Sequence, residues 1–329
     1  MGITHAATKS PGDMGTADEW NADHLVSSGF EPRQAATLVV AAYDSESTER
    51  ADYVCDGTAD EVQINQAITA LNGVGGKVLL LEGHYNIAAS VVLDDDIVLE
   101  GQGFYTIIAA TTEITMLYSN AKNRVQIKNL RIYGAGGSLQ NHYGISISGG
   151  EDGAVINCMV DNVSSYQIMF GNHTNGRIIN CISRDSTRLV TGIGIIASSC
   201  SNMMILGCIV EDNRAEGIRF VGVTHSIIKN CIVRGNGTYG LNIRLTSEDC
   251  VFSDNIVEGH SSHGIRLDND TNRCIVANNR CKDNAGDEII VEDADCDDNL
   301  VHGNHCLGVH ANAYTDNGTN TTSADNVLA

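Results

Sequence analysis

Side chains that could catalyse a reaction gather between residues 263 and 292. Arg266 or His263 could remove a proton from a substrate, provided that a positive group stabilises the negative charge that then develops. Asp268 and Glu292 could instead act as the two carboxylates of a retaining hydrolysis, which requires carboxyl groups about 5 Å apart. The same carboxylates could bind Ca²⁺, the one cofactor that these residues suggest. The predicted catalytic residues are therefore Arg266, His263, Asp268 and Glu292.

A wider group of residues could hold the substrate. Tyrosine rings present apolar faces, while charged and amide groups supply hydrogen bonds. The predicted binding residues are Tyr143, Tyr166, Glu216, Arg219, Tyr239, Asn242 and Arg244. The competing interpretation is an ordinary solvated surface, on which Arg244 and Asp268 form an exposed ion pair worth at most about 1 kcal/mol. In either case, loss of an outward side chain such as Arg266 should spare the fold.

A repeated phrase determines where these residues lie. Seven times between Val155 and Val309, apolar residues and a polar residue precede Asn, Gly or Asp and then Cys or Asn. The last residue of the phrase recurs every 23 to 27 positions. It forms the column Cys158, Cys181, Cys208, Cys231, Asn255, Asn279 and Asn304. A unit this short cannot bury an apolar face alone, so the period predicts a solenoid.

Apolar and polar residues alternate inside each repeat, as in Ile218-Arg219-Phe220 and Ile265-Arg266-Leu267. This period of two is typical of strands and favours a parallel β-helix over a leucine-rich repeat, which needs a leucine framework. Equivalent residues of successive coils then stack about 4.8 Å apart, so the cysteines form a thiol stack that continues as an amide stack. The column predicted to face inward is Ile147, Phe170, Ala197, Phe220, Ile243, Leu267 and Val291. The column predicted to face outward is Ser146, Met169, Ile196, Arg219, Asn242, Arg266 and Ile290.

With these repeats the chain resembles the right-handed parallel β-helix, or pectate-lyase-like, superfamily over roughly residues 51 to 309. The resemblance implies an all-β, single-stranded right-handed parallel β-helix of about ten coils. Residues 310 to 329 are then expected to form a C-terminal cap and tail.

The entry into the first coil supports the same resemblance. Thr58 and Glu61 have the spacing of a capping box. One apolar helical face follows, made of Ile64, Ala67, Ile68 and Leu71. These residues predict a helix near residues 59 to 72, which in this superfamily caps the open end of the solenoid and shields its strand edges.

In this superfamily an outward strand face commonly binds an extended polysaccharide. The resemblance therefore implies a polysaccharide ligand, with uronate-containing chains among the candidates, and a polysaccharide lyase or glycoside hydrolase activity. The chain departs from two catalytic patterns of the superfamily. It lacks the paired aspartates with Gly-His-Gly of polygalacturonases and the Asp-Pro-His-Tyr of alginate epimerases. A noncatalytic structural or adhesive tail protein is the alternative.

The N-terminal fifty residues carry a second resemblance. The stretch from Ile3 to Ala6, followed by the stretch from Pro11 to His24, is similar to a segment recurrent near the start of phage tail and tail-fibre proteins. It implies a tail-attachment segment and linker over residues 1 to 50, in a protein that is virion-associated or released extracellularly. Tail spikes are commonly homotrimers, although no motif here specifies one. The competing interpretation is a disordered leader or cloning remnant.

Composition excludes several other classes of protein. The formal net charge of −21 opposes nonspecific nucleic-acid binding. No apolar run approaches 18 residues and no basic, apolar signal peptide opens the chain, which predicts a soluble protein without Sec targeting or a membrane partner. The eleven cysteines are odd in number and four share one column, so buried free thiols are favoured over a disulfide framework.

Overall fold

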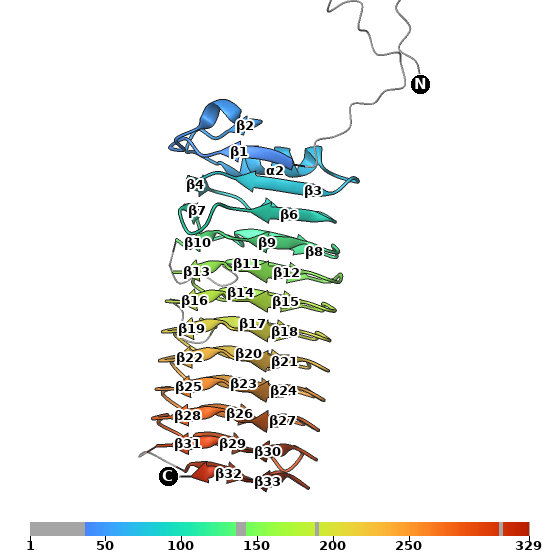
Figure 1. Cartoon of the computed structure of the whole chain (residues 1–329), viewed down its shortest axis with the longest axis vertical. Helices are drawn as coiled ribbons and strands as arrows, with labels where there is room; N and C mark the ends of the chain where they lie inside the picture. The colour runs from blue at the N-terminus through green and yellow to red at the C-terminus, as the bar shows by residue number, and fades with distance from the viewer. Residues whose placement is uncertain (1–36, 136–142, 188–190, 309–311, 329) are drawn as a thin grey trace, which may run out of the picture. The chain divides into compact units, whose positions relative to one another are not determined.

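The computed structural model describes residues 37–135, 143–187, 191–308 and 312–328. Over these residues, short parallel strands stack into a β-solenoid of about ten coils (Figure 1). Each regular coil contributes one strand to each of three sheets, which we call A, B and C. The predicted parallel β-helix is confirmed.

The three sheets have 13, 11 and 10 strands. Sheet A contains β1 (Thr37–Ala41), β2 (Tyr53–Val54), β3 (Gly76–Leu80), β6 (Ile97–Glu100), β9 (Gln126–Lys128), β12 (Ala154–Ile156), β15 (Arg177–Ile179), β18 (Met204–Leu206), β21 (Ile227–Lys229), β24 (Val251–Ser253), β27 (Ile275–Ala277), β30 (Leu300–His302) and β33 (Thr322–Ala324). Sheet B contains β4 (Gly83–Ile87), β7 (Thr106–Ala110), β10 (Arg131–Tyr133), β13 (Met159–Asp161), β16 (Ile182–Arg184), β19 (Ile209–Glu211), β22 (Ile232–Arg234), β25 (Ile256–Glu258), β28 (Arg280–Lys282), β31 (His305–Leu307) and β34 (Val327–Leu328). Sheet C contains β5 (Val91–Val92), β8 (Leu117–Asn120), β11 (Ile145–Ser148), β14 (Ile168–Gly171), β17 (Ile195–Ser198), β20 (Ile218–Val221), β23 (Leu241–Arg244), β26 (Ile265–Leu267), β29 (Ile289–Val291) and β32 (Tyr314–Asp316).

The repeated phrase forms the tight turn between sheets A and B. Asn157, Asn180 and Asn230 have φ angles of 53°, 53° and 55°, and Gly207 occupies the same left-handed conformation. Asparagine and glycine tolerate this backbone better than other residues. The repeated residue types thus set the corner that separates the two sheets.

The interior of the solenoid, which we call the lumen, is filled with buried apolar side chains at the positions that the sequence predicted. The inward column from Ile147 to Val291 is fully buried. All eleven cysteines are free and buried, as predicted. The thiol column then continues as an amide stack, in which Asn255 Nδ2 donates to Asn279 Oδ1 and Asn279 Nδ2 donates to Asn304 Oδ1, each over 3.0 Å.

Helix α2 (Glu61–Ala70) covers the first coils, and a 3₁₀ turn (Thr48–Arg50) precedes it. Its apolar face, Ile64, Ala67, Ile68 and Leu71, is buried, as predicted. The predicted capping box is wrong, because Asp60 is the N-cap residue and Glu61 Oε2 accepts the Ala88 N–H instead. No helix among the described residues is long and apolar enough to span a membrane.

Strand pairing extends past both expected limits of the solenoid. β1 precedes residue 51 and pairs with β3, because Leu38 and Val40 continue the strand pattern of sheet A. β32, β33 and β34 follow residue 310 and extend all three sheets by another coil. The segment similar to phage tail proteins, Ile3 to His24, lies outside the described residues.

Candidate functional site

The predicted site residues lie on the outward side of sheet C, which we call the outer C face. Strand pairing places the predicted column Met169, Ile196, Arg219, Asn242 and Arg266 in register across five successive strands. Their inward neighbours fill the lumen, so these side chains point away from it. The predicted register is confirmed.

Arg266 is the centre of an ionic cluster on this face. Its Nη1 atom lies 2.5 Å from Asp268 Oδ2 and 3.4 Å from Asn242 Oδ1, and its Nε donates to Glu292 Oε2. The guanidinium carbon also lies 4.9 Å from the centre of the Tyr239 ring. These contacts leave the Arg266 side chain only 12% exposed.

The Tyr239 ring contacts both Arg266 and His263. Tyr239 and His263 stack with ring centroids 5.9 Å apart and an angle of 6° between the rings. His263 Nδ1 accepts the Asp287 backbone N–H over 2.8 Å. A neutral imidazole with an accepting Nδ1 carries its proton on Nε2. Neither nitrogen is then free to take a proton from a substrate in this conformation.

Two polar residues of the cluster are buried although they point outward. Asn242 is 0% exposed and Asp268 is 1% exposed. The expectation of an exposed Arg244–Asp268 pair is wrong for Asp268, which lies against Arg266 and 3.8 Å from Arg244 Nε. Arg266, from the same coil as Asp268 and the coil after Asn242, lies against both of these groups. Asn242 Nδ2 has no hydrogen-bond partner among the described residues, which leaves one buried donor unused.

Burial raises the pKa of Asp268, and a hydrogen bond with Asp293 raises it further, although Arg266 acts in the opposite direction. The same hydrogen bond lowers the pKa of Asp293. The two carboxyls therefore share a proton more readily than isolated aspartates do. For Arg266, burial favours the neutral form, but Glu292 and Asp268 outweigh it and raise the pKa. This direction argues against Arg266 as a base.

The remaining predicted residues form two further groups. Tyr143 and Tyr166 stack with centroids 5.0 Å apart and 9° between their rings. Beside Tyr166, the outward side chains of Ile193, Ile196 and Ala215 form a small apolar cluster. Between this region and the ionic cluster, Arg219 Nε donates to Glu216 Oε2 over 2.6 Å.

The structure thus brings Arg266, His263, Asp268 and Glu292 together, but the guanidinium occupies the space between the two carboxylates. A hydrolysis or a Ca²⁺ site at Asp268 and Glu292 would first require Arg266 to move. Among the residues that the structure describes, no three metal-binding side chains of His, Cys, Asp or Glu converge.

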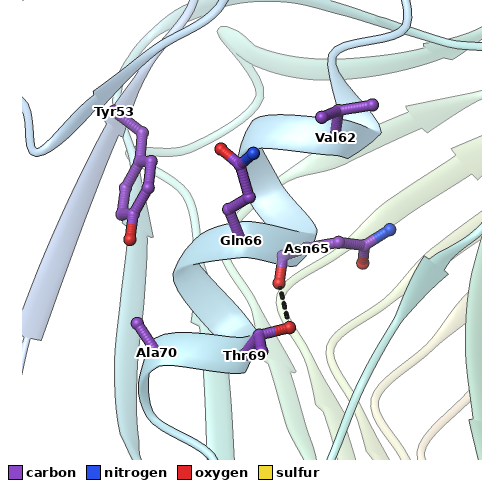
Figure 2. Close-up of a pocket in the computed structure, with 6 residues that line it drawn as sticks. All are labelled: Tyr53, Val62, Asn65, Gln66, Thr69 and Ala70. Carbon is purple, nitrogen blue, oxygen red and sulfur yellow. Dashed lines mark hydrogen bonds between the residues drawn. The ribbon is translucent and has the colours of Figure 1, made fainter.

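A hollow of about 600 Å³ that the sequence did not indicate lies beside helix α2 (Figure 2). Its lining residues are Tyr53, Val62, Asn65, Gln66, Thr69 and Ala70. Asn65 is already engaged, because its side chain bonds the Ser90 carbonyl and the Val92 N–H. Thr69 Oγ1 donates to the Asn65 carbonyl over 2.7 Å (Figure 2). The lining offers no carboxylate, imidazole or amine for catalysis.

Comparison with known proteins identifies the fold. Residues 114–280 match the sequence profile of a family described as "Right handed beta helix region". A search of curated proteins gave no match. Among solved structures, ORF18 of Geobacillus virus E2 is 16% identical with a TM-score of 0.65, over 82% of this chain and 59% of that one. The AlgE4 A-module of the Azotobacter vinelandii mannuronan C-5 epimerase is 15% identical, with a TM-score of 0.59, over 82% and 93%.

The Dettilon tailspike protein gp208 is 15% identical to this chain with a TM-score of 0.58, over 80% of this chain and 59% of the tailspike. This chain therefore spans little more than half the length of both viral proteins. At these identities the likeness concerns the fold alone.

Proposed function

Because the chain belongs to the right-handed β-helix family, we propose that its outer C face binds an extended polysaccharide in the manner of a phage tail protein. The observation that carries this proposal is the pair of stacked ring platforms on one outward face, Tyr143 with Tyr166 and Tyr239 with His263. Flat rings with nearby polar groups suit sugar rings. The names of the similar structures support the class of ligand, because one is a mannuronan epimerase and another a tailspike.

The residues between the two pairs of stacked rings would supply the polar contacts to a bound polysaccharide. Tyr166 and Tyr239 belong to coils three apart, a separation of roughly 14 Å, so a bound chain would run along the solenoid axis. Arg219 and Arg244 lie near this path and would meet sugar hydroxyls or uronate groups. They matter because the chain as a whole is acidic and would repel a polyanion. Asn242 Nδ2 supplies a buried donor that would gain its first partner if Arg266 turned towards a bound ligand and uncovered it.

Cleavage by a hydrolase or a lyase is the second candidate. The observation that favours a hydrolase is the raised pKa of Asp268, because a general acid must keep its proton near neutral pH. Asp268 would donate that proton only after Arg266 turned away and exposed it. Glu292 would be the partner carboxylate. The alternative to a glycan-binding or glycan-cleaving protein is a noncatalytic structural tail protein that binds no glycan.

The test is incubation of the full chain with a panel of neutral and uronate polysaccharides. Binding is measured by affinity electrophoresis, and cleavage by reducing ends and by the absorbance of unsaturated products. We expect Tyr239→Ala and Tyr166→Ala to weaken binding at least tenfold, about 1.4 kcal/mol. Tyr133→Ala is the matched control, because Tyr133 lies exposed on sheet B. If the parent protein binds no polysaccharide, or if both variants bind as the parent does, the proposal fails.

A further inference from the structure

The outward side of sheet B carries an aliphatic stripe that no part of the proposed function uses. Strand pairing stacks five residues in register, one from each of β13, β16, β19, β22 and β25. They are Met159, Ile182, Ile209, Ile232 and Ile256, and each is partly exposed. We call them the isoleucine stripe. Branched aliphatic side chains offer no flat ring for a sugar, but they pack well against other protein side chains.

A column of alternating charge runs beside the stripe, two residues further along each strand. We call it the charge ladder. In coil order it reads Asp161, Arg184, Glu211, Arg234, Glu258 and Lys282. Arg234 lies 2.6 Å from Glu211, and Arg184 lies 3.5 Å from Asp161. Three acids face three bases, so the ladder is neutral.

This neutrality matters because the whole chain has a formal charge of −21. Two copies of so acidic a chain repel each other over most contacts. Contact through the charge ladder avoids that repulsion, and the ladder residues keep their own ion-pair partners when water is removed. The partner that fits the face is therefore another copy of the same chain.

We propose that the outward side of sheet B is a docking surface for a second copy in antiparallel orientation. A two-fold axis along the strand direction, between β19 and β22, would place each column opposite itself with the coil order reversed. Glu211 then meets Arg234 of the other copy and Arg184 meets Glu258, whereas Asp161 is only 3% exposed and keeps its bonds to Arg131 and Arg184. Within the stripe, Ile209 meets Ile232 and Ile182 meets Ile256. A parallel contact in register would instead set like charges against each other.

The match continues beyond the ladder. Under the same axis β10 faces β31, so Tyr133, which is 41% exposed, meets Leu307 of the other copy. The eight matched strands extend over roughly 35 Å, but each strand is only about 10 Å long. Stable dimers bury about 800 Å² on each partner, which is more than one such strip offers. We therefore expect a reversible dimer that forms at micromolar concentration.

Sedimentation velocity of the full chain over a dilution series measures the association. We expect Glu211→Arg to abolish it, because two arginines would then meet, and Glu211→Arg/Arg234→Glu to restore it. Circular dichroism checks that each variant folds. Lys229→Glu, which changes a charge on sheet A, is the control and should leave the dimer unchanged. A monomer at all concentrations, a trimer, or an unchanged dimer in Glu211→Arg overturns the proposal.

Crosslinking tests the orientation. A short bis-maleimide should join an Ile182→Cys chain to an Ile256→Cys chain when the two variants are mixed, because the axis sets these residues opposite each other and the native thiols are all buried and do not react. Neither variant alone should crosslink efficiently, because the two copies of either cysteine would lie three coils apart along the solenoid, roughly 14 Å. Ile227→Cys, on the outward side of sheet A, should not crosslink in any mixture. Efficient crosslinking of Ile182→Cys with itself would show a parallel pair and overturn the antiparallel arrangement. Polysaccharide binding by crosslinked and free chains should be equal, because the outer C face stays open.

Discussion

The lumen and the outer C face both bury polar side chains, but they satisfy them in different ways. In the lumen, Asn255, Asn279 and Asn304 each bond the next amide and also a backbone carbonyl of the preceding coil. On the outer C face, Asn242 keeps an unused donor and Asp268 depends on an arginine from its own strand. A buried polar network in which every group is hydrogen-bonded stabilises a fold, whereas a network that leaves polar groups unpaired is typical of functional surfaces.

The largest expected effect is in the amide stack. Asn279→Ala removes an acceptor from the Asn255 N–H groups and a donor from Asn304 and from the Phe252 carbonyl. Each buried group left unpaired costs about 1–3 kcal/mol, so we expect the free energy of unfolding to fall by about 4 kcal/mol. Urea unfolding measures it. The control Asn157→Gly changes an exposed left-handed turn residue and should cost a few tenths of a kcal/mol. A cost below about 1 kcal/mol for Asn279→Ala would remove the distinction between the two regions.

The next largest expected effect is a loss of stability in acid, caused by a buried histidine at the corner between sheets B and C. His260 is buried, its Nδ1 accepts the Asn236 N–H, and its Nε2 bonds the Val233 carbonyl. Burial lowers the pKa of His260 from 6.5 to about 4. The folded state thus favours the neutral imidazole. Its contribution is complete above pH 6.5, the pKa in the unfolded chain, and is lost as the pH falls towards 4.

The expected loss across that window is about 3 kcal/mol, because one pKa unit corresponds to about 1.4 kcal/mol. Urea unfolding at pH 7, 5.5 and 4 measures it. His260→Asn is the matched variant, since Asn236 and Asn284 occupy the same position in adjacent coils. We expect this variant to remove much of the pH dependence between 6.5 and 4. Equal pH dependence in parent and variant would show that other groups control acid unfolding.

The strand register, and therefore which residues stack on one another, could be predicted from the sequence. The burial of side chains outside the lumen could not. A strand slipped by one residue would turn every side chain to the wrong face, so the alternation around Phe220 and Leu267 was enough to set the register. The burial of Asp268 could not be predicted, because it depends on the rotamer of Arg266. The capping box failed for a similar reason, since Asp60 bonds Gly57 and Asn86 rather than leaving the N-cap to Thr58. The charge ladder on sheet B is a signal that the sequence does carry, because its charged residues recur with the period of the coils.

The smallest expected effect concerns Arg266, and it revises the expectation that outward substitutions spare the fold. Arg266→Ala would leave the Asp268 carboxylate buried with only Arg244 as a cationic neighbour, at 3.8 Å. Breaking a buried pair costs about 3–5 kcal/mol, but Asp268 keeps its bond to Asn269 and its neighbour Arg244, so we expect about 2 kcal/mol at pH 7. Arg266→Ala/Asp268→Asn should recover most of this loss, because it removes the stranded charge. The control Arg234→Ala breaks an exposed pair with Glu211 and should cost at most about 1 kcal/mol. If urea unfolding gives equal costs for the two arginines, Asp268 is not held by Arg266, and the outer C face behaves as an ordinary solvated surface.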